Sequence, residues 1–349
     1  MASVRQIAES TGVSVATVSR ALNNRPEVSA EMRDRVWAEA ERVGYRHNAR
    51  SRATNLIGLA YPGKPVNAEF GGFDAAIVSG VTRGVNEARF DVALVNIDRD
   101  KLPNETFSQF FRRKGLQGVV LRSFADTRHI CEAIADEGFP SVVIADRFDN
   151  PRVNFIYSDS YGQSQQAVEH LIHLGHQRIG LCIHMVADTD HADRRRAYEQ
   201  TLSAHVVRLD PSLIVEVIGD MAGGAAGVNR LMSLPHPPTA IFLTDPLATL
   251  GALRRALELN IDVPGDLSII GFDDSDVRQM AYPVYTAVCQ DAATLGFKAA
   301  EWLTRRLHHR AEETFRVKVN TMFEVNQTTG VPPETTVRIL PDGQRLETH

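Results

Sequence analysis

The sequence predicts an α-helical head followed by an α/β core of two parallel-sheet lobes. Residues 3–45 contain three short runs of helical spacing, separated by a tight turn and a polar loop. From residue 56 on, continuous apolar runs alternate with helical runs, which is typical of parallel sheets covered by helices on both faces. Because this alternation extends over more than about 250 residues, two lobes fit it better than one.

The first predicted helix opens with a capping pattern. Ser3 and Gln6 form the sequence S-x-x-Q. In this pattern the serine side chain caps the first turn, and the glutamine side chain accepts a hydrogen bond from the serine amide. Ile7 and Ala8 face inward, and Gly12 is expected to end the helix.

The second predicted helix lies in the segment GVSVATVSRAL, with Ser14 as its N-cap. Its apolar side chains fall on one face, which comprises Val18, Ala21 and Leu22. The opposite face carries only small, hydroxyl and arginine side chains: Val15, Ala16, Thr17, Ser19 and Arg20. A solvated helix would hold more opposite charges at i,i+4 spacing, so this face indicates contact with another molecule.

Ser29 is expected to cap a third helix, which Gly44 ends. Its apolar residues recur at helical spacing: Met32, Val36, Trp37, Ala40 and Val43. Two short helices joined by a tight turn and braced by a third form the helix-turn-helix arrangement.

The core alternates candidate strands with candidate helices. The strands are expected at 56–61, 91–97, 118–123, 141–146, 155–159, 178–183, 213–218, 239–245 and 267–274. The helices are expected at 75–88, 127–138, 162–175, 194–205, 223–234, 246–260 and 293–309. Residues 331–349 show no periodicity and are expected to form a loose tail.

Composition excludes several classes of protein. No stretch is long and apolar enough for a membrane span, and the N-terminus has no secretion-signal pattern, so a cytoplasmic protein without membrane contact is expected. The three cysteines, Cys131, Cys182 and Cys289, form no paired motif and are expected to be buried free thiols.

The charge is distributed unevenly along the chain. Residues 1–55 hold nine arginines, no lysine and six acidic residues, which gives +3. Because the whole chain carries −5, the remainder carries −8. A cationic head whose positive groups are all arginine suits contact with phosphates and guanine.

Two motifs that could indicate a metal site or an enzyme are discounted. His170, His173 and His176 have no cysteine or carboxylate to complete a zinc ligand set. The segment GGAAG at 223–227 lacks the lysine of a phosphate-binding loop. No combination of nucleophile and base is found, so neither an enzyme nor a cofactor is expected.

Several long segments resemble the lactose-repressor (LacI/GalR) family of bacterial transcription regulators. In the head the segment is VRQIAESTGVSVATVSRALNNRPEVSAEMRDRVWAEAERVGYRHNA, and in the core the segments include HLIHLGHQRIGL and VPGDLSIIGFDDSD. The resemblance spans roughly residues 2–330. It implies a helix-turn-helix domain at 1–46, a hinge at 47–55 and a periplasmic-binding-protein-like effector-binding and dimerisation core at 56–330.

The resemblance implies roles for the outer face of the second helix. Val15, Ala16 and Arg20 fall at base-reading positions, where arginine can reach guanine and small apolar groups can meet a thymine methyl. The phosphate contacts are expected from Ser3, Thr17, Ser19 and Asn23. The alternative is a helical cap domain with a solvated face.

The hinge departs from the family pattern. Arg52 fits the family's arginine, but Thr54 stands where the family has a leucine that wedges into the minor groove. Asn48, Arg50 and Arg52 are the candidate hinge contacts, with the arginines entering a narrow minor groove. The alternative is a short tether whose arginines touch only phosphates.

The resemblance places an effector between the two lobes. The candidate contacts are Phe73, Asp74, Asp146, Arg194, Asp245, Asp273 and Gln290. Carboxylates, an arginine and an aromatic ring suit a carbohydrate, although Thr244 replaces the family's usual asparagine. The alternative for Arg194 and Asp273 is a structural ion pair that braces the lobes; for Asp146 and Gln290 it is likewise a purely structural role.

The expected function is therefore a homodimeric repressor that binds double-stranded operator DNA and responds to a sugar-like molecule. The sequence contains no heptad tail of the kind that would join dimers into a tetramer, and this favours the dimer. Two alternatives stay open. One is a regulator gated by a protein partner, and the other is a cytoplasmic sugar-binding protein or enzyme with an accessory helical head.

Overall fold

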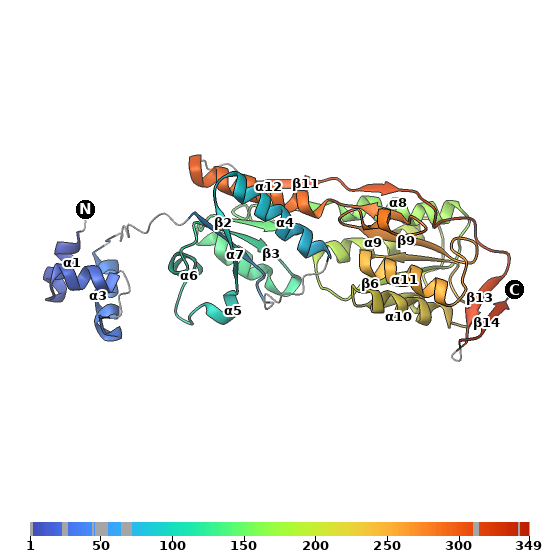
Figure 1. Ribbon diagram of the computed structural model, residues 1–349, viewed down its shortest axis with the longest axis horizontal. Helices are drawn as coiled ribbons and strands as arrows, with labels where there is room; N and C mark the ends of the chain where they lie inside the picture. The colour runs from blue at the N-terminus through green and yellow to red at the C-terminus, as the bar shows by residue number, and fades with distance from the viewer. Residues whose placement is uncertain are drawn as a thin grey trace. The chain divides into compact units, whose positions relative to one another are not determined.

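The structure is a computed structural model that describes residues 3–22, 27–43, 45, 55–63, 72–309, 314–340 and 343–348 (Figure 1). The chain divides into two compact units, Met1–Thr54 and Asn55–His349, which are described separately. Asn23, Gly44, Asn48, Arg50, Arg52 and Thr54 lie outside the described residues.

The first unit is a bundle of three helices, α1 (Val4–Thr11), α2 (Val15–Leu22) and α3 (Ala30–Arg42). The three predicted serine caps are confirmed, because Ser3, Ser14 and Ser29 accept hydrogen bonds from the amides of Gln6, Thr17 and Met32. Gly12 ends α1 in the left-handed region at φ 71°. The core of the bundle consists of Ile7, Ala8, Val18, Ala21, Leu22, Val28, Val36 and Ala40.

Trp37 differs from its expected apolar neighbours in α3. Its side chain is 41% exposed, whereas Val36 and Ala40 are buried. The helix turns about 100° per residue, so Trp37 follows Val36 away from the bundle core.

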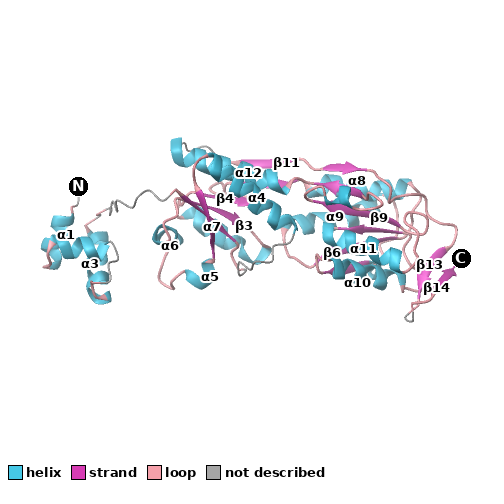
Figure 2. Ribbon diagram, in the orientation of Figure 1, coloured by secondary structure: helices cyan, strands magenta, loops and turns pink. Residues whose placement is uncertain are grey.

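The second unit contains two lobes, each built on one six-stranded sheet (Figure 2). The N-lobe sheet has the order β11-β5-β4-β3-β1-β2, and all its strand pairs are parallel. Its strands are β1 (Leu56–Ala60), β2 (Asp91–Val95), β3 (Gly118–Arg122), β4 (Ser141–Ile144), β5 (Phe155–Ser158) and β11 (Arg316–Val319).

Helices cover both faces of the N-lobe sheet. One face is covered by α4 (Gly72–Glu87) and α12 (Ala292–His309), whose glycine-containing faces pack closely against each other. The other elements of the lobe are α5 (Ile97–Asp100), α6 (Phe107–Arg113), the 3-10 turn η1 (Ala125–Thr127) and α7 (Arg128–Asp136). Two apolar clusters lie on the two faces, as a sheet buried on both sides requires.

The C-lobe sheet has the order β12-β10-β9-β8-β6-β7, with only β10 and β12 antiparallel. Its strands are β6 (Ile179–His184), β7 (Ile214–Val217), β8 (Ala240–Leu243), β9 (Ser268–Asp273), β10 (Thr286–Cys289) and β12 (Met322–Glu324). The other elements are α8 (Ser160–His173), α9 (Thr189–Ala204), η2 (Pro211–Leu213), α10 (Met221–Met232), α11 (Pro246–Glu258) and η3 (Val277–Met280).

The chain crosses between the lobes three times, from β5 to α8, from β10 to α12 and from β11 to β12. Two of these crossings are bonded to each other at Asp159. Its amide donates to the carbonyl of Val319, and its own carbonyl accepts from the Thr321 hydroxyl at 2.7 Å. The hydrogen bonds keep the two segments side by side where the lobes meet.

The expected loose tail over 331–349 is wrong for the described residues. Strands β13 (Thr336–Ile339) and β14 (Arg345–Thr348) form an antiparallel pair. Val337 and Ile339 are buried against the apolar cluster that contains α10. Apolar and polar residues do alternate in the segment V-R-I. A strand of four residues is too short for this alternation to be recognised in the sequence.

The expected strands and helices of the core are confirmed. The additional elements α5, α6, β10, β11 and β12 are mostly short. Cys131 and Cys182 are buried as expected, while Cys289 is only partly buried. Within the described ranges, no helix combines the length and apolar character needed to cross a membrane.

Candidate functional site

The outer face of α2 is exposed as the sequence predicts. Val15 is 46% exposed, and Ala16, Ser19 and Arg20 are also on the surface. Among the residues that the structure describes, none forms an ion pair with Arg20, whereas Arg42 on α3 is bonded to Glu39 at 2.6 Å. Arg20 therefore keeps its guanidinium donors available for another molecule.

Two hydroxyl groups of the head have local roles. The Ser14 hydroxyl lies 2.8 Å from that of Thr17 and also caps α2. The Ser3 hydroxyl accepts from the Gln6 amide, so it holds the first turn of α1 in shape. This cap leaves the first amides of α1 at the helix end, where a helix favours anions.

A buried arginine links the two lobes of the second unit. Arg122 ends strand β3 and is 4% exposed. Its guanidinium is 2.8 Å from the carboxylate of Asp188 in the C-lobe and 3.5 Å from that of Asp74 in α4. The rings of Phe73 and Phe124 lie close to the guanidinium, with their centroids 5.3 and 4.9 Å from the central carbon of Arg122.

The contacts continue from Arg122 through Asp188 into α9. Asp188 caps α9 and accepts a bond from His191 Nδ1 at 2.8 Å, and His191 Nε2 lies 3.3 Å from the Arg194 guanidinium. Burial lowers the pKa of His191 to about 4, so the ring is neutral at pH 7. A neutral ring that donates from Nδ1 to Asp188 accepts at Nε2 from Arg194.

Arg194 is the cation at the C-lobe end of this chain of contacts. It is 3% exposed, donates to the Thr244 carbonyl at 2.7 Å and stacks over Phe272 at 3.7 Å. Its Nε has no hydrogen-bond partner among the described residues. A buried guanidinium with one unused donor has a group available for an acceptor of a bound molecule.

Three carboxyl groups surround Arg194, and burial raises the pKa of each. The pKa values of Asp190 and Asp274 rise to about 7, and that of Asp245 also rises. Arg194 opposes the shift in all three. Near neutral pH the carboxyl groups of Asp190 and Asp274 therefore exchange protons readily and can donate or accept hydrogen bonds.

The predicted residue Asp273 has a structural role. Its carboxylate accepts bonds from the amides of Ser275, Val277 and Arg278 and pairs with the Arg278 guanidinium at 2.6 Å. The alternative that Asp273 forms an ion pair with Arg194 is therefore wrong, because Asp273 pairs with Arg278 instead. The neighbouring Asp274 accepts from Gln290, and Arg194 opposes the rise of its pKa.

The other predicted residues are spread over the junction of the lobes. Asp245 caps α11 through the Ala248 amide. Gln290 donates to Asp274 at 2.6 Å, and its oxygen has no partner among the described residues. Asp146 accepts from the Thr189 hydroxyl of the C-lobe at 2.5 Å and pairs with Arg128.

Sequence reasoning missed Arg122, Asp188, Asp190, His191 and Asp274. Two of them carry a recognisable signal. Arg122 ends the otherwise apolar strand GVVLR, and Asp188 precedes a helix in the N-cap pattern D-T-D-H. The remaining three belong to the C-lobe, whose fold brings Asp274 together with α9.

The arrangement provides polar binding groups. Burial raises the pKa of the thiols of Cys131, Cys182 and Cys289 to about 12, so they are protonated at pH 7. Within the described ranges, no group of three or more histidine, cysteine or acidic side chains could hold a metal ion. The site is suited to binding a small polar molecule.

Replacing Asp274 with asparagine tests the buried carboxyl. Asp274 binds its proton more tightly when folded, so its contribution to stability is present below pH of about 4 and is lost as the pH rises to about 7. The unfolding free energy of Asp274→Asn minus that of the wild type should therefore grow over this range, by on the order of 3 kcal/mol. Chemical denaturation at pH 4.5, 6 and 8 — roughly spanning the window — measures this difference.

Asp136→Asn is the matched control, because this carboxylate is half exposed at the end of α7. Its substitution should change the free energy of unfolding only slightly, because an exposed surface carboxylate contributes little. A flat difference for Asp274→Asn would contradict the assignment of a buried, proton-binding carboxyl.

Comparison with known proteins agrees with this architecture. Residues 3–48 match the family described as bacterial regulatory proteins, lacI family, and residues 168–329 match a periplasmic binding protein-like domain. The probable HTH-type transcriptional repressor ExuR of Bacillus subtilis is 28% identical over 331 residues, which cover 93% of this chain and 97% of that protein. The ribose operon repressor of Haemophilus influenzae is 27% identical, covering 91% of this chain and 96% of that protein.

Solved structures show the same relationship. A LacI family transcriptional regulator from Mycobacterium smegmatis is 30% identical with a TM-score of 0.63, covering 79% of this chain and 99% of that chain. The complex of the transcriptional regulator CelR with cellobiose is 25% identical with a TM-score of 0.67, covering 94% of this chain and all of that chain. From its head, its two-lobed core and these matches, the chain belongs to the lacI family of bacterial regulatory proteins.

Proposed function

We propose that this chain is a sequence-specific transcriptional repressor whose affinity for operator DNA is set by a small polyhydroxylated molecule bound between the lobes. The supporting observation is the chain of contacts from Arg122 through Asp188 and His191 to Arg194, which connects the N-lobe to the C-lobe. A molecule that binds these groups favours one arrangement of the lobes over another, as an effector must.

The chemistry of the site favours a carbohydrate. Carboxylates accept from vicinal hydroxyls, Arg194 donates, and the Phe73 ring beside Arg122 offers an apolar face. Two of the relatives are named for sugars: one is a ribose operon repressor, and the other was solved with cellobiose. We therefore expect Asp74, Asp146, Arg194, Asp274 and Gln290 to be the effector contacts, with Phe73 as the platform.

The DNA contacts proposed for the head are those of its outer face. Val15, Ala16 and Arg20 read base edges, and Ser3, Thr17, Ser19 and Asn23 contact phosphates. Asn48, Arg50 and Arg52 remain the proposed hinge contacts. We propose a homodimer in the cytoplasm that reads two half-sites about one helical turn apart, which sedimentation with and without the duplex would measure.

Replacing Arg194 tests the effector site. The operator is first selected from random duplexes, and binding is then measured with a panel of pentoses, hexoses, uronates and disaccharides. For Arg194→Met, we expect operator affinity within about twofold of the wild type and loss of at least about tenfold in sugar affinity. Operator affinity of both proteins should fall steeply with salt, because phosphate contacts release counterions.

The matched control is Arg195→Met, the next residue on α9, which is 44% exposed and pairs with Glu199. This variant should respond to the sugar like the wild type. If the wild type binds the operator but no small molecule, a regulator gated by a protein partner is favoured instead. If it binds sugar and no duplex, the sugar-binding protein or enzyme is favoured.

A further inference from the structure

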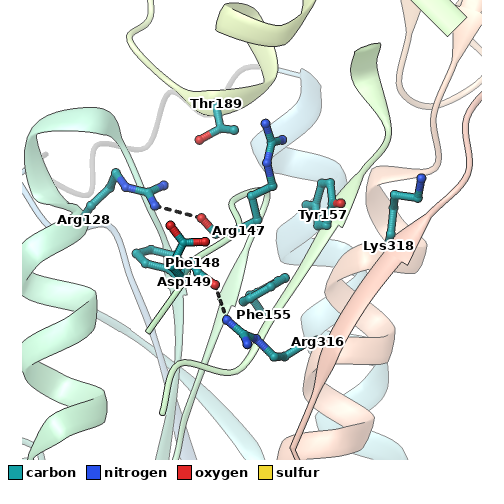
Figure 3. A pocket seen from close by; sticks show the side chains of 9 residues that line it. All are labelled: Arg128, Arg147, Phe148, Asp149, Phe155, Tyr157, Thr189, Arg316 and Lys318. Carbon is teal, nitrogen blue, oxygen red and sulfur yellow. Dashed lines mark hydrogen bonds between the residues drawn. The ribbon is translucent and has the colours of Figure 1, made fainter. Parts of the chain in front are cut away.

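A pocket lies beside the inter-lobe contacts, at the β5–β11 edge of the N-lobe sheet (Figure 3). Its volume is about 640 Å³, which is in the range of small-molecule sites. The pocket is lined by Arg128, Arg147, Phe148, Asp149, Phe155, Tyr157, Thr189, Arg316 and Lys318. None of these was a candidate binding residue in the sequence.

The register of two parallel strands places four of these side chains on one face. Arg316 is paired with Phe155, and Lys318 is paired with Tyr157, two residues further along each strand. Since alternate residues of a strand point to the same side, both cations and both rings face the pocket. The residues between them, Ile156 and Val317, belong to the apolar cluster on the opposite face.

Three arginines stack on three aromatic rings in this pocket. The central carbon of Arg128 lies 4.2 Å from the Phe148 centroid, that of Arg316 lies 4.9 Å from Phe155, and that of Arg147 lies 5.5 Å from Tyr157. Stacking orients a guanidinium but leaves the N–H groups at its edge available. Such edges bind planar or tetrahedral oxyanions through two parallel hydrogen bonds.

The cations of the pocket outnumber its acids. The lining contains four cationic side chains and one carboxylate, Asp149, which is exposed. Arg128 pairs with Asp146, Arg147 with Asp193 at 2.5 Å, and Lys318 with Asp159 at 2.9 Å.

Arg316 differs from the other three cations. It donates to the carbonyls of Phe148 and Asn150 and forms no ion pair with any residue that the structure describes. Its positive charge is therefore not balanced by a carboxylate in the described part of the pocket, and an anion there would supply the balance.

We propose that this pocket binds the phosphate group of a small phosphorylated metabolite. Arg316, Arg147 and Lys318 hold the phosphate, and the rings of Phe155 and Tyr157 lie beneath the organic part. The pocket adjoins the inter-lobe site at Asp146, which accepts from Thr189 and pairs with Arg128. It is a neighbouring site, because Arg316, Arg147 and Lys318 hold its ligand rather than Arg122 and Arg194.

The position of the pocket couples it to both lobes. Thr189 comes from α9 of the C-lobe, and Arg147 reaches Asp193 of the same helix. A phosphate that draws Arg147 away from Asp193 weakens one inter-lobe contact and adds a contact of its own. This coupling, unlike phosphate binding itself, rests on the proposed function of the inter-lobe site.

Calorimetry on the full-length protein in chloride buffer tests the proposal. The probes are inorganic phosphate, a hexose 6-phosphate and the same hexose without phosphate. The wild type should bind both phosphates, and Arg316→Gln and Lys318→Gln should each weaken them about tenfold. Lys318 is half exposed, so Lys318→Gln keeps the test valid if Arg316→Gln disturbs the fold, which thermal melting reports.

Arg195→Gln serves as the control, because this arginine is also partly exposed and ion-paired but lies outside the pocket. The proposal is overturned if neither phosphate binds, if Arg195→Gln weakens binding equally, or if both pocket variants bind like the wild type. Loss of phosphate binding in Arg194→Met alone would place the anion among the inter-lobe contacts and would also overturn it. If the protein shows no response of operator affinity to sugars, the proposed function fails, but phosphate binding measured by calorimetry still tests this proposal.

Discussion

Arg122→Met is expected to lower the free energy of unfolding by about 3–5 kcal/mol, the cost of leaving one partner of a buried ion pair uncompensated. The guanidinium of Arg122 contacts Asp188, Asp74 and the Ser123 carbonyl. Burial opposes ionisation of Asp188, yet His191 and Arg122 together hold its pKa well below the ordinary value. Methionine has a similar length but offers neither charge nor donor, so the Asp188 carboxylate stays buried with less compensation.

Denaturant unfolding of the full-length protein at pH 7 measures this effect. Arg254→Met is the comparison, because Arg254 forms an exposed i,i+4 pair with Glu258. Such a pair contributes about 0.3–0.5 kcal/mol. Equal effects of the two substitutions would show that Arg122 is as dispensable as a surface cation, and the proposed link between the lobes would be wrong.

Arg20→Ala is expected to remove base preference at one position of each operator half-site. A bidentate arginine–guanine contact discriminates against the wrong base by about 1–3 kcal/mol, so the preference should fall by about 10- to 100-fold. Arg20 is exposed on α2 and forms no ion pair with the described residues, which leaves its guanidinium available for this contact. Selection from random duplexes, repeated with the variant, gives the position and the size of the change.

Arg5→Ala provides the comparison on the same unit. Arg5 is also exposed, on α1, but lies outside the face of α2. Its loss should lower affinity equally for all duplexes and reduce the salt dependence by about one phosphate contact. If Arg20→Ala leaves the selected sequence unchanged, the assignment of α2 as the base-reading helix fails.

Local signals in the sequence were sufficient for the helices and strands. A serine cap needs only a hydroxyl and an amide three residues away, so Ser3, Ser14 and Ser29 could be recognised without the fold. The apolar strands and the amphipathic helices were recognised by their spacing for the same reason. The hairpin of β13 and β14 escaped because its burial depends on α10, which is about a hundred residues away in the chain.

The candidate site was predicted only in part. Arg194 was identified from the resemblance and Gln290 was a further candidate, and the structure brings both to the junction of the lobes. Asp273 was named from the resemblance and Asp274 was not considered, although the two residues are adjacent and chemically identical. The difference comes from the turn at η3. Three amides and Arg278 bond to Asp273, whereas Asp274 is bonded to Gln290.

The sequence alone determined three features: the head of three capped helices, the arginine on the outer face of α2, and the alternation of strands and helices that defines the two lobes. These features depend on residues within a few turns of one another, and their physical causes are local. The tertiary structure alone decided which charges meet across the lobes, such as Arg122 with Asp188, and which aromatic rings orient the arginines of the pocket at the β5–β11 edge. A pairing of buried charges depends on distance in space and on exclusion of water, and neither is written in the spacing of residues along the chain.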